Sequence, residues 1–187
     1  MEKEIKSAGI WFKSFVMISF ITLLFSCSGQ KHMIDKSVAN ELELPKYLGT
    51  WYEIARYDHP FERGLVGVTA NYSMRPDGKI KVLNSGYKNS LGGEYTETLG
   101  KAKIPDPENE QAKFKVAFFW IFYADYYVLE LDENYQWALI GSKSDKYLWI
   151  LSRTPQLEPN VYNYLLHRIE QRGYDTSALI KVEQKVE

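Results

Sequence analysis

The feature that most constrains the fold is an alternation of apolar and polar residues that runs from Gly49 to Arg153. Successive side chains of a strand point to opposite faces, so a period of two predicts half-buried strands. Turn signals such as Arg75-Pro76-Asp77-Gly78 interrupt the alternation about every ten residues. The pattern predicts eight strands, at residues 51–58, 67–74, 79–87, 94–104, 113–122, 125–131, 137–143 and 147–153.

Short connections between these segments are typical of an antiparallel meander. An open sheet would leave two edges exposed to aggregation, whereas closure into a barrel removes both edges. We therefore expect an all-β fold, an eight-stranded antiparallel up-and-down barrel.

The pattern changes after Arg153, where apolar residues recur at helical spacing. Pro159 suits the first turn of a helix and Gly173 suits its end. The apolar positions of this segment are Val161, Tyr162, Leu165, Leu166 and Ile169. They predict a C-terminal helix that packs on the outside of the barrel, followed by a short ninth strand at residues 178–182.

The N-terminus has the pattern of a secretory signal, with Lys3, Lys6 and Lys13 before an apolar run at residues 15–25. This run is too short to span a bilayer. It ends at Cys27, the only cysteine, in a sequence that resembles a bacterial lipobox, although Phe25 departs from that pattern. The alternative is a secreted protein with a free thiol. We expect a signal peptide at residues 1–26, a lipidated tether at 27–44 and the barrel with its helix at 45–187.

Lipidation of Cys27 would anchor the chain to a membrane, so we expect a membrane as a partner. Ser28 follows the cysteine, where an aspartate would resemble an inner-membrane retention signal. We therefore expect a lipid anchor in the outer membrane, on its periplasmic face. The formal net charge is −1, which does not indicate binding to nucleic acid.

The alternation also predicts which side chains line the barrel. We expect an interior of small, apolar and aromatic residues with a few polar ones, which is typical of a ligand pocket. A barrel packed solid is the alternative. The expected ligand-binding residues are Glu53, Ala55, Tyr57, Val68, Ala70, Tyr72, Val82, Asn84, Thr98, Ala102, Val116, Phe118, Tyr127, Leu129, Ala138, Ile140, Tyr147 and Trp149.

Catalytic and metal-binding patterns are not found. His32, His59 and His167 lack the spacing of metal ligands, so no metal or cofactor is expected. No glycine-rich phosphate loop or serine elbow occurs. Glu53 and Asp125 would suit acid–base chemistry if buried, but we favour a role as hydrogen-bond acceptors.

Three short motifs resemble those of the lipocalin family, in the same order and spacing. They are Gly49-x-Trp51 on the first strand, Asp125-Tyr126 on the sixth, and Arg153 after the eighth. The stretches "GTWYEIARYDHPFERG", "YLWILSRTP" and "GYDTSAL" are similar to bacterial outer-membrane and apolipoprotein D-like lipocalins. The resemblance implies that Arg153 stacks on Trp51 and closes the barrel floor, a structural role.

The resemblance further implies a membrane-anchored carrier of fatty acids or lysophospholipids, as a monomer or weak homodimer. A lipid-modifying enzyme on the same scaffold and a structural lipoprotein with a filled barrel are the alternatives.

Overall fold

The computed structural model describes residues 33–118 and 122–186. The predicted signal peptide and Cys27 lie outside these residues. The described chain forms α1 (Leu44–Tyr47), β1 (Gly49–Tyr57), β2 (Leu65–Met74), β3 (Ile80–Lys88), β4 (Tyr95–Lys103), β5 (Lys113–Ala117), β6 (Ala124–Leu131), β7 (Trp137–Gly141), β8 (Leu148–Ser152), α2 (Pro159–Gln171), a 3₁₀ turn (Thr176–Ala178) and β9 (Leu179–Lys181).

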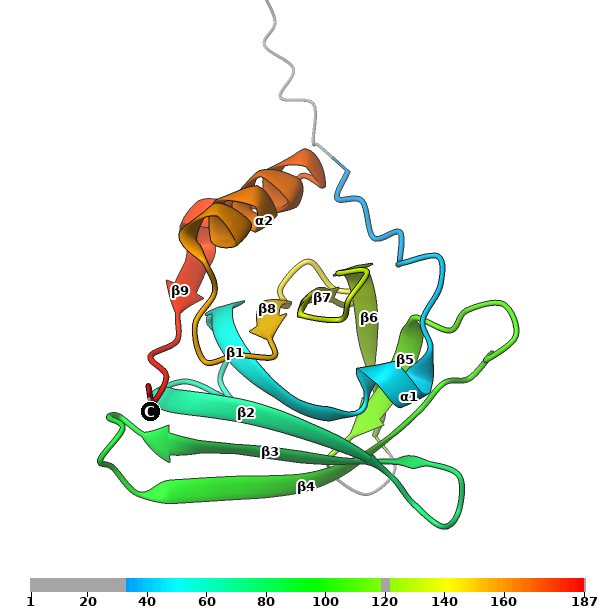
Figure 1. The fold of residues 1–187 in the computed structure, drawn as a ribbon, viewed down its shortest axis with the longest axis horizontal. Coiled ribbons are helices and arrows are strands. Elements are labelled where there is room, and N and C mark those ends of the chain that lie inside the picture. The colour runs from blue at the N-terminus through cyan, green and yellow to red at the C-terminus, as the bar shows by residue number, and fades with distance from the viewer. Residues whose placement is uncertain (1–32, 119–121, 187) are drawn as a thin grey trace, which may run out of the picture. The chain divides into compact units, whose positions relative to one another are not determined.

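Strands β1 to β8 close into an antiparallel barrel (Figure 1). Each strand pairs with its neighbour in sequence, and β1 closes the barrel by pairing with both β2 and β8. Strand β9 pairs with the second half of β1, outside the barrel. The predicted eight-stranded barrel and ninth strand are confirmed.

The second core of the protein lies outside the barrel, beneath α2. Leu165 and Ile169 of α2 are fully buried against outward-facing residues such as Leu139 and Ile150. The helix begins at Pro159, and Gly173 ends it with φ of +85°. Arg168 of this helix and Arg172, which follows its last residue, bind Glu130 of β6 at 2.9 and 2.7 Å. The predicted helix is therefore confirmed, together with its packing on the outer wall.

A β-bulge in β1 reverses the predicted orientation of two residues. Glu53 pairs with Leu151, but Ala55 pairs with Ile150, so the alternation shifts between them. Ala55 and Tyr57 therefore face the outer core, where the Tyr57 hydroxyl donates to the Asp175 carbonyl at 2.9 Å. Their predicted place in the barrel interior is wrong.

The orientation predicted for β6 is also wrong. Tyr126 and Val128 face the interior, whereas Tyr127 and Leu129 pack against the outer core. A second bulge follows, between Val128 and Glu130. Because α2 covers this wall, both faces of β6 are apolar and alternation alone does not distinguish them.

Residues 33–43 form a strap that lies on the barrel wall. Asp35 N–H donates to the Arg172 carbonyl at 2.8 Å, and Ala39 N–H donates to the Val128 carbonyl at 2.9 Å. Leu42 is buried in the inner core. The described part of the predicted tether is thus packed against the domain. Among the described residues, we find no helix with the length and apolar character needed to cross a bilayer.

Candidate functional site: the barrel interior

The up-and-down order of the strands gives the barrel two distinct ends. The floor is the end where β1 starts and β8 finishes. The mouth is the opposite end, where the β1–β2, β3–β4, β5–β6 and β7–β8 connections gather.

Trp51 and Arg153 close the floor. The guanidinium of Arg153 lies 3.8 Å from the centroid of the fully buried Trp51 ring. Arg153 also donates to the carbonyls of Lys46 and Thr50, at 2.7 and 2.8 Å. Gly49 has φ of +95°, and a Cβ there would lie 3.4 Å from the guanidinium. The contact implied by the sequence motifs is present.

A cluster of tyrosines fills the barrel above the floor. The hydroxyl of Tyr126 lies 2.6 Å from that of Tyr47 and 3.1 Å from that of Tyr72. Burial raises the pKa of all three hydroxyls, so they stay protonated and hydrogen-bonded. Tyr47 belongs to α1, before the first strand, and the sequence pattern did not indicate its role.

The deep half of the barrel is packed. Val82, Ala102, Val116, Ala138 and Ile140 are all buried in one cluster with the tyrosines. The small residues there do not leave the empty space that the sequence pattern predicted. At Gly100, for example, a Cβ would lie only 2.7 Å from the Phe118 ring, so the glycine makes room for that ring.

Some side chains on the inner wall of the barrel are not fully buried. The side chains that face inward but stay partly exposed are Ala70, Asn84, Phe118, Tyr147 and Trp149. Thr98, on the inward face of β4, is exposed, and Val68 is buried beside Gly86. The Oδ1 atom of Asn84 is buried without a hydrogen-bond partner among the described residues. An unmade hydrogen bond of this kind costs about 1–3 kcal/mol, so this oxygen is a free acceptor on the inner wall.

A group of buried charged residues lies where β1 ends and the β1–β2 connection begins. Arg56 donates to Glu53 at 2.6 Å and to the Glu62 carbonyl at 2.8 Å. Glu62 accepts from the Trp149 indole at 3.0 Å and lies 2.9 Å from the His59 ring. The bulge in β1 brings Arg56 inward, which period-two reasoning missed.

The two carboxyls of this group have opposite pKa shifts. Burial raises the pKa of Glu53 well above its usual range, and the neighbouring Glu62 raises it further. Burial alone would raise the pKa of Glu62 too, but His59 and Trp149 outweigh it and lower that pKa. Glu53 thus keeps its proton at a pH where Glu62 has lost its own.

The raised pKa of Glu53 predicts a dependence of stability on pH. Above a pH of about 4.3 the unfolded chain releases this proton while the folded chain retains it, so stability falls as pH rises. We expect Glu53→Gln to gain stability over the wild type by up to about 1.4 kcal/mol per pH unit in this window. Urea unfolding at a series of pH values measures the difference. A difference that does not change with pH would contradict the assignment.

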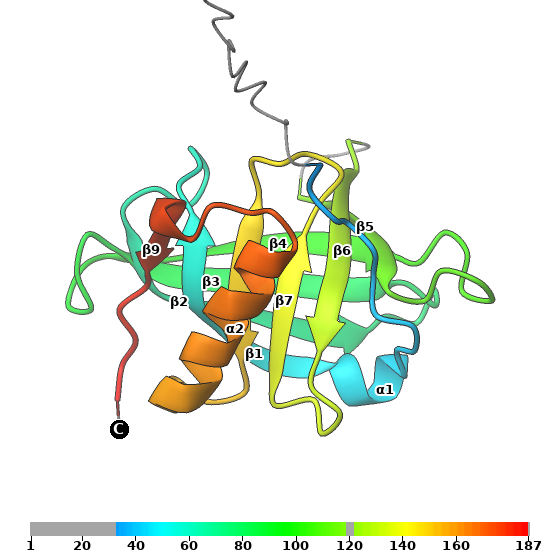
Figure 2. The ribbon, with the colours of Figure 1, turned by 90° about the horizontal axis from the view of Figure 1, so that it is seen from above.

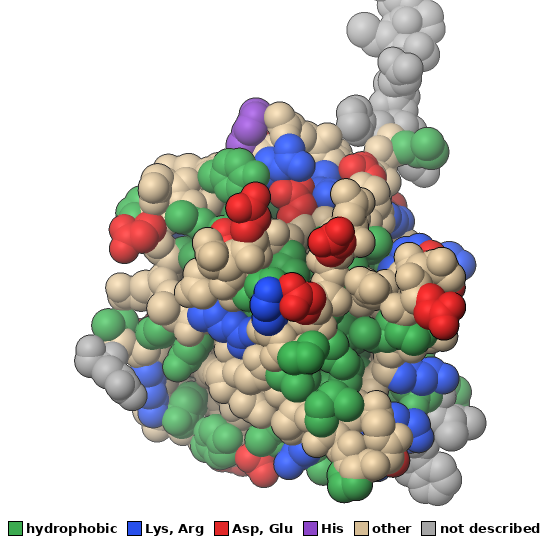
Figure 3. Space-filling view, turned by 45° about the vertical axis from the view of Figure 1, so that its right-hand side comes forward, with side chains coloured by type: hydrophobic (Ala, Val, Ile, Leu, Met, Phe, Trp, Pro, Cys, Tyr) green, Lys and Arg blue, Asp and Glu red, His purple; other side chains and the backbone are tan. Residues whose placement is uncertain are grey.

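On the face seen in Figure 3, acidic and basic side chains are mixed with apolar ones, and neither charge forms a large patch. Within the described residues, no three His, Asp or Glu side chains are grouped so that they could hold a metal ion.

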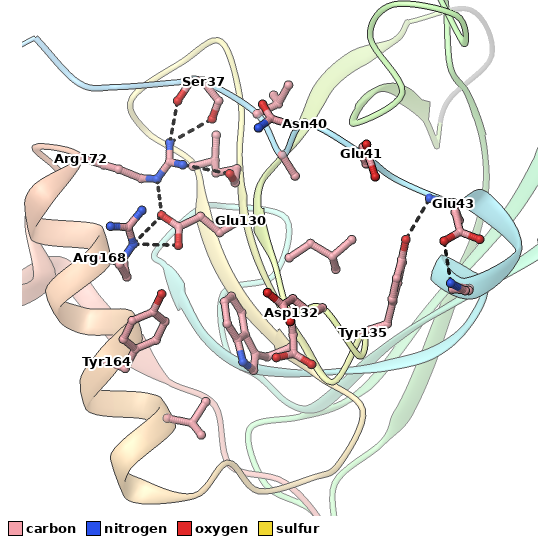
Figure 4. A pocket seen from close by; sticks show the side chains of 18 of the residues that line it. Ser37, Asn40, Glu41, Glu43, Glu130, Asp132, Tyr135, Tyr164, Arg168 and Arg172 are labelled. Carbon is pink, nitrogen blue, oxygen red and sulfur yellow. Dashed lines mark hydrogen bonds and ion pairs between the residues drawn. The ribbon is translucent and has the colours of Figure 1, made fainter.

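A second hollow lies outside the barrel, among the strap, α2 and the β6–β7 connection (Figure 4). Its volume is about 990 Å³ and it is widely open. Glu130 there is bound by Arg168 and Arg172, and Glu43 by Lys46 at 2.6 Å. Trp137 and Tyr164 line it, with their ring centroids 5.9 Å apart. Paired charges make this hollow less suited to a lipid tail than the barrel interior.

Comparison with known proteins agrees with this architecture. The profile of the lipocalin-like domain matches residues 42–184. The outer membrane lipoprotein Blc of Vibrio cholerae is 42% identical over 174 residues, covering 92% of this chain and 99% of the relative. Blc of Escherichia coli K12 is 43% identical over 162 residues, covering 87% and 90%. Mouse apolipoprotein D is 33% identical over 175 residues, covering 87% and 89%.

Solved structures show the same fold at lower identity. Insecticyanin of the tobacco hornworm Manduca sexta aligns with a TM-score of 0.67 at 22% identity, covering 81% of this chain and 85% of that one.

Proposed function

The chain belongs to the lipocalin-like family, and on this premise we propose that it is a membrane-anchored carrier of fatty acids or lysophospholipids in the cell envelope. The observation that carries the proposal is the shape of the interior. The floor is sealed by Trp51 and Arg153, whereas inward-facing Phe118 and Trp149, near the mouth, remain partly exposed.

Burial of an acyl chain is the driving force for loading. Each buried methylene contributes about 0.8 kcal/mol, so about ten of them supply the free energy of a micromolar complex before the costs of binding. The tail lies in the apolar space beside Phe118 and Trp149. The polar head stays near the mouth, where Asn84 accepts a hydrogen bond from a hydroxyl or a protonated carboxyl.

The envelope is the proposed location for two reasons. Relatives that cover most of the chain are named outer membrane lipoproteins. The lipobox-like sequence at Cys27 supplies the attachment site, and Ser28 in place of an aspartate favours the outer membrane. The residues after the cysteine lack the acidic run expected of surface-exported lipoproteins, which favours the periplasmic face. Such a carrier would hold or deliver lipids during membrane maintenance or stress.

A lipid-modifying enzyme on the same scaffold makes a different prediction. Glu53 is the buried carboxyl that would act as its acid, since burial raises its pKa. In that case Glu53→Gln abolishes turnover of a lipid while its binding persists.

Native mass spectrometry with lipid extraction tests the carrier. The chain is expressed from residue 28 in a bacterial host and purified without detergent. We expect a co-purifying fatty acid or lysophospholipid at near one per chain. A protein that is empty and also fails to bind an added fluorescent fatty acid would contradict the proposal.

A further inference from the structure

The described chain begins beside the barrel mouth. Lys36 donates to the Lys143 carbonyl at 2.6 Å and forms an ion pair with Asp145. Both partners belong to the β7–β8 connection, one of the four at the mouth. Figure 2 shows the start of the strap, in blue, next to this connection. The strap then runs along β6 to α1 at the floor.

The length of chain before the strap limits where a lipid anchor can hold the domain. The residues from Ser28 to Met33 reach at most about 22 Å when fully extended. A domain of about 150 residues is roughly 40 Å across, from its expected radius of gyration of about 15 Å. An anchor at Cys27 therefore cannot reach a membrane that lies against the floor.

The mouth and the floor also differ in the side chains they expose. Three large apolar side chains near the mouth are exposed: Met33 by 89%, Phe61 by 63% and Phe122 by 79%. Lys143 and Lys146, on the β7–β8 connection, are exposed and form no ion pair with a described residue. The floor connections carry six acidic side chains against two basic ones, Arg75 and Lys79, whereas the mouth connections carry nearly equal numbers of each; the floor acids are Asp77, Asp106, Glu108, Glu110, Asp132 and Glu133.

From these observations we propose that the mouth rim, formed by Met33, Phe61, Phe122, Lys143 and Lys146, docks on the phospholipid bilayer that holds the anchor. Exposed apolar side chains enter the boundary between headgroups and acyl chains, and lysines approach lipid phosphates. The acidic floor points away from the membrane. This inference rests on the proposed function. With its mouth against the bilayer, the barrel exchanges a lipid directly with the membrane, so the lipid does not pass through water.

The test measures which end of the barrel touches the bilayer. The full-length, lipidated chain is reconstituted in vesicles of phosphatidylethanolamine and phosphatidylglycerol that contain a nitroxide-labelled lipid. Acylation consumes the only native thiol, so Lys146→Cys at the mouth or Asn134→Cys at the floor can be labelled with a fluorophore. We expect the label at position 146 to be quenched at least twofold more strongly than the label at 134.

A pair of variants tests the apolar rim. In the Lys146→Cys background, Met33→Ser combined with Phe122→Ser is expected to remove most of the extra quenching. Met74→Ser is the control, because Met74 is 50% exposed at the floor end of β2. Equal quenching at both positions, stronger quenching at 134, or no effect of the rim variant would overturn the inference. An intact mass without acyl groups would overturn it too, because it removes the anchor.

Failure of this inference differs from failure of the proposed function. Binding of a fluorescent fatty acid to the wild-type chain in solution is measured separately. If that binding is present and the orientation is wrong, only the docking surface is refuted.

Discussion

Replacing Trp51 with alanine is expected to lower the free energy of unfolding by about 3–5 kcal/mol. The indole is fully buried, its Nε1 donates to the Tyr47 carbonyl at 2.8 Å, and Arg153 covers its face. The substitution leaves a cavity at the floor and removes the ring on which the partly buried Arg153 guanidinium stacks. Since domains are stable by about 5–15 kcal/mol, a large share of the total is lost. Urea unfolding followed by circular dichroism measures it.

Trp137→Ala is the matched control. Trp137 is only partly buried, on the outer face of β7, where its ring meets Tyr164 edge-on at 5.9 Å. We expect its loss to cost clearly less than the loss of Trp51. Equal costs for the two substitutions would contradict the role of Trp51 as the closure of the floor.

Replacing Ala70 with tryptophan is expected to weaken fatty acid binding at least tenfold while the barrel stays folded. Ala70 faces inward on β2, between its cross-strand partners Trp51 of β1 and Asn84 of β3, and it is only partly buried. An indole there occupies the space proposed for the acyl chain. A tenfold loss corresponds to about 1.4 kcal/mol, the contribution of fewer than two buried methylenes. Calorimetric titration with palmitate measures the affinity.

Ser73→Trp provides the comparison on the same strand. Ser73 points outward, so an indole there leaves the interior unchanged. Its affinity for palmitate should equal that of the wild type. Unchanged affinity in Ala70→Trp, with the fold verified by circular dichroism, would place the ligand somewhere other than the barrel.

The barrel could be predicted from sequence because its signals are local and repeated. Alternation predicts the strands, and turn sequences such as Arg75 to Gly78 predict where they end. The spacing from Pro159 to Gly173 likewise predicts the helix with accurate bounds. These patterns depend on neighbouring residues alone, so a single sequence contains them.

The inner and outer faces could not be fully predicted, because α2 buries the outer wall. Tyr127 and Leu129 are as apolar as Tyr126 and Val128, since each pair packs in a core. The bulge in β1 inserts one residue without a distinctive amino acid to mark it. One signal was available: a buried carboxyl such as Glu53 needs a hydrogen-bond partner, and Arg56, three residues further on, supplies one.

Other parts of the site depend on contacts far apart in the chain. Tyr47 lies before the first strand, and only barrel closure brings its hydroxyl to Tyr126. Glu62 reaches Trp149 because the β1–β2 connection folds back over the interior. The spacing of these residues in the sequence does not predict such contacts.

Quenching of tryptophan fluorescence by a brominated fatty acid tests the central claim most directly. Trp149 lines the barrel interior, whereas Trp137 lines the hollow outside it. We predict that Trp149→Phe removes most of the quenching seen in the wild type and that Trp137→Phe leaves it unchanged. Quenching that survives in Trp149→Phe and disappears in Trp137→Phe would place the lipid in the outer hollow and contradict a ligand site within the barrel.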